Sequence, residues 1–227
     1  MKKLLVVIPA FNEAQTISQV IDSIPRKISG VSSIKIVLID DGSTDQTPHI
    51  VLQKNVMVIR HLINRGLGAA LATGILYART LRADYMITMD ADGQHQGSDV
   101  QKLVNALIKN KVNVVIGSRL LKPAGMPFTR QAVNFMSNII TLLLFNRWTS
   151  DSQSGLRGFN RYAIDRIKIT SQRMEVSSEI IRELARLKLT YLEIQIKSIY
   201  TRYSLRKGQQ ISNAPHVVWK LLLQKFV

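Results

Sequence analysis

The sequence contains no cysteine and no apolar run of the ~20 residues that a membrane-spanning helix needs. The first absence excludes disulfide bonds and thiolate metal sites, and it is compatible with a reducing compartment. The second predicts that any contact with a membrane is peripheral. Aromatic residues make up only 6% of the chain. With no common recognition motif present either, this scarcity argues against a nucleic-acid-binding module.

Acidic residues are also scarce. Only 15 Asp and Glu residues stand against 31 Lys and Arg residues, so the formal net charge is +16. Such a charge suits a nucleic acid, an anionic lipid surface or a phosphate-rich substrate, and charge alone does not choose among them. The length of 227 residues and the hydrophobic content of 46% favour a globular fold rather than a disordered chain.

The first half of the chain alternates between short apolar runs and segments with helical spacing. The runs predicted as buried strands cover residues 4–8, 34–39, 57–59, 85–89 and 112–116. Helices are predicted between them, including one over 67–80. This alternation predicts βαβ units, and therefore an α/β fold with a mainly parallel sheet flanked by helices.

The second half loses this rhythm. The spacing predicts an amphipathic helix over 128–145, a loop over 150–160, a helix over 177–187 and a strand over 191–200. We expect one domain over 1–210. A C-terminal amphipathic helix within 211–227 would lie at a membrane interface or in a dimer contact.

Two carboxylates separated by one residue, Asp90 and Asp92, follow the fourth apolar run directly. Ligands of α/β sheets bind at the carboxyl ends of the strands. Two acids placed there repel each other unless a cation lies between them, and a hard divalent ion such as Mg²⁺ suits carboxylate oxygens. Asp and Gly also favour turns, but this position predicts a metal site.

Polar motifs follow the other four predicted strands as well. They are Phe11-Asn12-Glu13, Asp40 to Asp45, Asn64 to Ala70, and Gly117-Ser118-Arg119. Phe11 could stack on a base and Glu13 could bond it or cap a helix, whereas Asp45 is predicted to cap the helix that Thr47 opens. The glycines at 66 and 68 predict close backbone packing.

Two arginines in these motifs are candidate phosphate ligands. Arg65 precedes the glycine pair, and Arg119 follows the fifth strand, where its planar fork could clamp a diphosphate. Parallel strands end at the same sheet edge, so all five motifs are predicted to gather there. That convergence, more than any single motif, predicts an active site.

In this order the motifs resemble those of glycosyltransferase family 2, and within it the dolichyl-phosphate mannosyltransferase-like group. The segment from Asp151 to Phe159 also matches, and the likeness spans Val6 to about Gly208. The resemblance implies a GT-A fold and an inverting, metal-dependent hexosyltransferase using Mg²⁺ or Mn²⁺. The implied donor is GDP-mannose or a UDP-hexose, and the implied acceptor is a polyprenyl phosphate.

The resemblance also implies roles for individual residues. Pro9, Phe11, Glu13, Ile39 and Asp41 would hold the nucleoside, Asp92 and Gln94 would ligate the metal, and Asp90 and Ala91 would lie beside the ribose and diphosphate. Arg119 and Arg202 would contact phosphates, and Ser154 and Gly155 would lie near the reacting sugar. Lys207 belongs to a basic segment whose register differs from the Arg, Gly and Ser-Lys of relatives.

The acceptor leaves alternatives open. An ionised phosphate needs no strong base, whereas a sugar hydroxyl on a polysaccharide or glycan needs one, for which Glu179 is the candidate. The amphipathic segment 128–145, flanked by Arg147 and Trp148, could lie peripherally at the cytoplasmic face of a membrane. It could equally pack on the sheet or in a homodimer.

Overall fold

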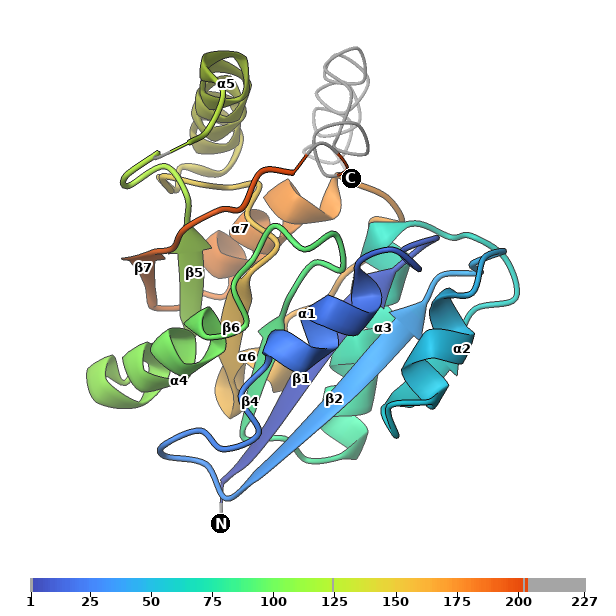
Figure 1. Cartoon of the computed structure of the whole chain (residues 1–227). Helices are drawn as coiled ribbons and strands as arrows, with labels where there is room; N and C mark the ends of the chain where they lie inside the picture. The colour runs from blue at the N-terminus through green and yellow to red at the C-terminus, as the bar shows by residue number, and fades with distance from the viewer. Residues whose placement is uncertain (1, 124, 202, 204–227) are drawn as a thin grey trace.

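A computed structural model of the chain describes residues 2–123, 125–201 and 203. The predicted helix within 211–227, together with Arg202 and Lys207, lies outside the described residues. The strands are β1 (Lys3–Ala10), β2 (Ser33–Asp40), β3 (Met57–Arg60), β4 (Tyr85–Thr88), β5 (Val114–Ser118), β6 (Arg157–Asn160) and β7 (Tyr191–Gln195). They form one seven-stranded sheet in the order β3-β2-β1-β4-β6-β5-β7 (Figure 1).

Helices cover both sides of this sheet. They are α1 (Ile17–Ser23), α2 (Thr47–Leu52), α3 (Leu67–Thr80), α4 (Asp99–Asn110), α5 (Phe128–Phe145), α6 (Arg161–Arg166) and α7 (Val176–Arg186). Apolar residues of α1, α2 and α4 share one core cluster with the sheet, and those of α3, α6 and α7 share the other. Because both faces are covered, β1 is buried at every position after Lys3.

The five strands predicted in the first half are confirmed, with boundaries that move by up to two residues. β1 pairs in parallel with β2 and β4, and β2 pairs in parallel with β3. β6 runs antiparallel between β4 and β5, so β5 keeps the direction of the other four. Their carboxyl ends therefore lie at one edge of the sheet, as the alternation predicts.

The loop prediction for 150–160 is wrong over its last four residues, which form β6 in the middle of the sheet. The strand is short, begins with an arginine and contains Gly158, a composition typical of loops. Gly158 packs closely here, since a Cβ atom on it would stand 2.8 Å from Ile87 Cδ1 and that side chain would have to shift. The strand predicted over 191–200 is also shorter and ends at Gln195.

The start of α3 packs tightly on the segment before α7. A Cβ atom on Gly68 would stand 2.0 Å from the Ser171 carbonyl oxygen, and Gly66 has φ +97. This confirms the close packing predicted from the two glycines. The Ala69 N–H donates to the Gln172 carbonyl at 3.1 Å, so the structure uses this backbone donor inside the fold.

The segment before α2 is held by Asp45. Its carboxylate accepts hydrogen bonds from the Thr47 N–H at 2.9 Å and the Ala14 N–H at 3.1 Å. The N-cap position itself falls at Gln46, one residue later than predicted. Asp45 still supplies the acceptor for the first helical N–H, and it ties this turn to the end of β1.

Helix α5 is amphipathic, but it buries polar residues and exposes large apolar ones, which is the reverse of a helix that packs on a hydrophobic core. Its two buried residues are Asn138 and Thr141. Large apolar side chains are exposed instead: Phe128 at 81%, Phe135 at 55%, Met136 at 56% and Leu143 at 73%. At about 100° per residue these four lie within a sector about 100° wide, whose centre is about 140° from the centre of the buried pair. In Figure 1 the helix stands clear of the sheet, at the end toward which β5 points.

No helix within the described ranges combines the length and the apolar character that crossing a bilayer requires.

Candidate active site

The carboxyl ends of the parallel strands collect the predicted polar motifs at one sheet edge. β1 leads into Phe11 and Glu13, β2 into Asp41, β4 into Asp90, and β5 into Arg119. Two further segments reach the same place. The 149–156 loop precedes β6, and an isolated bridge joins His95 to Ser198.

Asp90 lies at the centre of this edge. Its Oδ2 atom is 3.2 Å from His95 Nε2, and a Cβ atom on Gly155 would stand only 2.0 Å from the same oxygen. Burial opposes ionisation of this carboxyl. The hydrogen bond with His95 and the positive charges around it, Arg119 and Arg157 included, outweigh burial and lower the pKa of Asp90.

Asp92 is in the opposite electrostatic situation. Burial and the negative charge of Asp90 raise its pKa from 3.8 to about 6, and Glu13 adds to the repulsion. The hydrogen bond from the Gln94 N–H to Oδ1 at 2.9 Å and the charge of His95 act in the other direction but do not outweigh them. Two carboxylates from one short turn therefore differ in their tendency to ionise, and the negative charge of Asp92 is only partly compensated.

This donor set fits a divalent cation that is shared with a substrate. Among the residues that the structure describes, no group of three or more His, Asp and Glu side chains is arranged to hold a metal ion. Mg²⁺ commonly takes one or two carboxylates and completes its shell with water and substrate phosphates. The partly compensated charge of Asp92 beside Asp90 fits that pattern, with Gln94 buried next to them.

Arg119 does not present its fork to the open edge of the sheet. Nε and Nη2 bind the two oxygens of buried Asp151 at 2.7 and 2.8 Å, and the Arg119 N–H donates to Oδ2 at 3.0 Å. Asp151 raises the pKa of Arg119 despite the opposing effect of burial. The predicted Arg119–diphosphate clamp stays a prediction, and any such contact would have to use the guanidinium donors other than the Nε and Nη2 hydrogens that bind Asp151.

Arg157 is the second guanidinium near Asp90. It is 2% exposed, and its Nη2 atom donates to the Ser152 carbonyl at 2.6 Å and the Ser177 carbonyl at 3.4 Å. Its Nε atom is buried without a hydrogen-bond partner. Burial lowers the pKa of Arg157 to about 10, although Asp90 and Asp151 oppose the shift. The Arg157 guanidinium therefore stays charged at neutral pH and compensates the carboxylates of Asp90 and Asp151.

The residues predicted to hold a nucleoside divide into two groups. Pro9 and Ile39 pair with each other inside the sheet and are buried, as is Ala91 beyond β4. Phe11 is 40% exposed at the end of β1, and Glu13 accepts hydrogen bonds from Thr16 Oγ1 and from the Tyr203 hydroxyl. Of these residues only Phe11 exposes a side chain that a nucleoside could reach, since Glu13 is also buried.

Asp41 holds the loop between β3 and α3. Its carboxylate accepts from the Arg65 N–H at 3.0 Å and the Gly66 N–H at 2.6 Å, and it lies 2.7 Å from His61 Nδ1. These contacts use both oxygens of a side chain that is 3% exposed. They orient the exposed Arg65 at the sheet edge, where its phosphate contact stays a prediction.

Two other predicted residues are engaged inside the fold. Ser154 is fully buried, and its Oγ atom accepts from the Leu156 N–H at 3.3 Å. Glu179 on α7 is also fully buried, and it accepts from the Thr170 N–H and Oγ1, the Ser171 N–H and Arg182. With four donors on its carboxylate, Glu179 anchors the 170–171 segment, and its role as a general base has no support in this geometry.

Sequence reasoning assigned no role to three residues that shape the site: His95, Asp151 and Arg157. All three lie in motifs quoted for the resemblance, so their presence was visible. Their partners were not, because Asp151 and Arg119 are 32 residues apart and Arg157 belongs to the strand that was predicted as loop. Only the fold brings them to Asp90.

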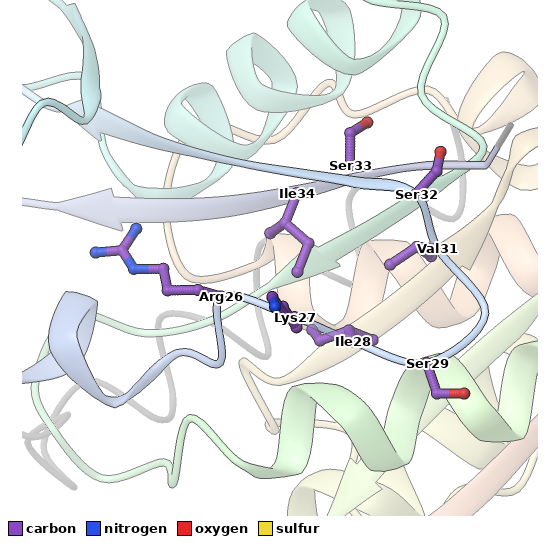
Figure 2. A pocket seen from close by; sticks show the side chains of 8 residues that line it. All are labelled: Arg26, Lys27, Ile28, Ser29, Val31, Ser32, Ser33 and Ile34. Carbon is purple, nitrogen blue, oxygen red and sulfur yellow. The ribbon is translucent and has the colours of Figure 1, made fainter.

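A cavity of about 380 Å³ lies elsewhere, between α1 and β2 (Figure 2). Its lining residues are Arg26, Lys27, Ile28, Ser29, Val31, Ser32, Ser33 and Ile34. β2 begins at Ser33, so the cavity lies at the amino edge of the parallel strands, opposite the edge that carries Asp90. Its polar side chains point in different directions (Figure 2), and it is not part of the candidate active site.

Comparison with known proteins identifies the family. The profile of glycosyl transferase family 2 matches residues 5–168, and the chain belongs to this family. An uncharacterized protein of Methanocaldococcus jannaschii is 39% identical over 98% of this chain and 92% of its own length. The UDP-N-acetylglucosamine–dolichyl-phosphate N-acetylglucosaminyltransferase of Methanococcus voltae is 32% identical over 99% of this chain and 96% of its own length.

A more distant relative and a solved structure complete the comparison. The dolichol-phosphate mannosyltransferase of Pyrococcus furiosus is 27% identical over 79% of this chain, which spans 52% of that protein. Glucosyl-3-phosphoglycerate synthase from Mycobacterium tuberculosis, crystallised with Mn²⁺, UDP-glucose and phosphoglyceric acid, superposes with a TM-score of 0.77 at 20% identity, covering 99% of this chain and 79% of that one. The predicted GT-A fold is confirmed, and the protein is a glycosyltransferase.

The charge of Asp92 gives a pH-dependent stability prediction. Its pKa is raised in the folded protein, so ionisation costs stability as pH rises from about 4 through about 6. We expect Asp92→Asn to stabilise the metal-free protein near pH 7 by up to about 3 kcal/mol, since the pKa rises from 3.8 to about 6 and one pKa unit is worth about 1.4 kcal/mol. The gain should shrink toward zero at about pH 3, where Asp92 is mostly protonated in both states. Urea unfolding at the two pH values measures it.

Asp165→Asn is the matched control, because this carboxylate is exposed and forms only a long 3.5 Å ion pair with Arg161. Its effect should stay within about 0.5 kcal/mol. A loss of stability on Asp92→Asn near pH 7 would show that the fold already compensates this charge, and it would remove the basis for a cation site.

Proposed function

We propose that this glycosyltransferase moves a hexose from a nucleotide-diphosphate sugar to a polyprenyl phosphate, with inversion at the anomeric carbon. The observation that carries the proposal is the unequal carboxylate pair, Asp90 and Asp92, close to two buried guanidinium groups at one sheet edge. The carboxylates suit a cation bound to the donor diphosphate, and the guanidinium groups suit a second anion. Relatives named for transfer to dolichyl phosphate support this acceptor class.

On the donor side, Asp92 and Gln94 are the residues that would hold Mg²⁺ or Mn²⁺. When bound, such a cation neutralises charge on the departing diphosphate. The synthase of the same fold that was crystallised with Mn²⁺ and UDP-glucose supports the use of a divalent metal. Phe11 is exposed at the end of β1 next to Glu13, where a base could stack and a ribose could be hydrogen-bonded.

The transfer breaks the bond between the anomeric carbon and the donor diphosphate, and it forms a bond from that carbon to an acceptor phosphate oxygen. The nucleoside diphosphate leaves with the bonding electron pair. A phosphate monoester has a second pKa of about 6 and is largely ionised near pH 7, so it needs no strong base. The protein must instead hold two anions together, and the charges of Arg119 and Arg157 serve that task.

The alternative acceptor, a hydroxyl group of a glycan, needs a general base. Glu179 was the candidate, but its carboxylate already accepts three hydrogen bonds from Thr170 and Ser171 and a fourth from Arg182. Asp90 is kept ionised by positive neighbours, which makes it a weak base. The described geometry therefore favours a phosphate acceptor.

We further propose that the exposed apolar sector of α5 lies against a membrane, where a polyprenyl phosphate is found. The occupant is argued from charge and chemistry. Arg130 and Arg147 bracket the helix, Trp148 is 47% exposed beside it, and the chain carries a net charge of +16. Apolar side chains next to cationic ones fit an anionic lipid surface better than water. A second copy of the chain is the other occupant that the test must exclude.

The transfer itself is tested by nucleoside diphosphate release. Purified protein would be supplied with Mg²⁺ or Mn²⁺, a polyprenyl phosphate, and a panel of UDP- and GDP-sugars. We expect release with one donor class, only when the lipid phosphate is present. Asp92→Asn should lower the rate by about 100-fold or more, because it removes charge stabilisation of the leaving group.

Asp165→Asn should leave the rate unchanged. Release that depends on a free sugar or oligosaccharide, and not on the lipid phosphate, would overturn the acceptor assignment while keeping the donor site.

Membrane docking is tested by flotation with phosphatidylglycerol vesicles. Replacing Phe135 and Leu143 by Ser should lower vesicle partitioning by at least about tenfold, since burying each side chain is worth about 1.5–3 kcal/mol. Added salt should weaken binding of the unmodified protein. Leu76→Ser is the control, because Leu76 is 63% exposed on α3. Equal flotation of both variants, or loss of a dimer in sedimentation without any vesicle binding, would refute docking.

A further inference from the structure

Helix α5 is held on the molecule by polar side chains rather than by an apolar core. Of its two buried residues, Thr141 contacts Ser178 on α7 through its hydroxyl at 3.3 Å. The other, Asn138, is 1% exposed and contacts the 149–156 loop. A helix whose apolar sector is exposed thus meets the active-site loop through one buried amide.

The Asn138 side chain binds the loop on both sides of Asp151. Its Nδ2 atom donates to the Ser150 carbonyl at 2.7 Å, and its Oδ1 atom accepts from the Ser152 N–H at 2.9 Å. The amide thus uses both its donor and its acceptor, as a backbone peptide group does in a β-sheet. Asp151, between the two contacts, is the residue that holds Arg119.

The two halves of this clamp are not equivalent. Glu193 on β7 also fixes Ser150, accepting from its N–H and its hydroxyl at 2.8 Å. Ser152 has no such second anchor on its N–H, and its carbonyl accepts from Arg157 at 2.6 Å. The part of the loop that depends on Asn138 therefore begins at Ser152, the residue that carries the contact to Arg157.

We propose that Asn138 is a positioning residue that couples the lipid-facing helix α5 to Arg119 and Arg157. Docking of α5 on a membrane fixes Asn138, Asn138 fixes the loop around Asp151 and Ser152, and the loop sets the two guanidinium groups near Asp90. The inference rests on the proposed function, because it assigns regulation by the lipid surface to that same site.

The test compares Asn138→Ala with Thr141→Val. Both remove a buried polar group from the same side of α5, but only the first removes the clamp on the loop. Asn138→Asp is a second variant of nearly equal shape. It keeps an acceptor for the Ser152 N–H and sets a carboxyl group against the Ser150 carbonyl, so exchange at Ser152 should stay slower than in Asn138→Ala.

Two readouts separate positioning from general damage. Hydrogen exchange of the full chain is followed over 149–156, with and without phosphatidylglycerol vesicles. Steady-state kinetics give the KM for the polyprenyl phosphate. Equilibrium binding gives the Kd for the nucleoside diphosphate. We expect Asn138→Ala to speed exchange from Ser152 onward but not at Ser150. It should also raise acceptor KM by at least about tenfold with nucleotide Kd unchanged, since small misplacements of binding groups cost about that much or more.

Vesicles should slow exchange at Ser152 in the unmodified protein and in Thr141→Val, but not in Asn138→Ala. Equal exchange and equal acceptor KM in Asn138→Ala and Thr141→Val would overturn the inference. If the unmodified protein transfers no sugar to a polyprenyl phosphate, the proposed function fails, while exchange at Ser152 without vesicles still decides whether Asn138 positions the loop.

Discussion

The repulsion between two carboxylates at the end of one strand is the constraint around which the site is arranged. Asp90 and Asp92 leave β4 two residues apart, and the fold treats them differently. His95 and two guanidinium groups keep Asp90 ionised, whereas burial and Asp90 itself hold the pKa of Asp92 near 6. The protein compensates the negative charge of Asp90 and compensates that of Asp92 only in part. A cation that arrives with a diphosphate is the ligand this imbalance suits.

A loop from the second half of the chain packs directly against Asp90. The 149–156 loop passes so close to Asp90 that even a Cβ atom on Gly155 would overlap with its carboxylate. The position of the loop and the ionisation of Asp90 therefore depend on each other. The Arg119–Asp151 pair and Arg157 fix the loop and supply positive charge near Asp90. Because Asn138 holds the same loop, α5 belongs to the active-site architecture although it stands clear of the sheet.

The sequence predicted the parts of this structure that depend on local pattern. Apolar runs marked five parallel strands, so the convergence of their ends on one edge followed from topology. What it missed depends on contacts between distant segments. β6 was predicted as loop because a short segment that contains glycine is typical of loops, and the Arg119–Asp151 pair was missed because nothing local links two residues 32 positions apart. Glu179 appeared to be a possible base, since hydrogen bonds from the 170–171 segment cannot be inferred from spacing.

The most direct test of this account is the linkage between cation and nucleotide. Mn²⁺ binding would be measured by calorimetry in the absence and presence of UDP or GDP, for the unmodified protein and for Asp92→Asn. The account predicts weak Mn²⁺ binding alone, tightened by at least about tenfold, or about 1.4 kcal/mol of coupling, when the matching nucleotide is present. Asp92→Asn should abolish that coupling. Mn²⁺ affinity that is the same with and without either nucleotide, or coupling that survives Asp92→Asn, would contradict it.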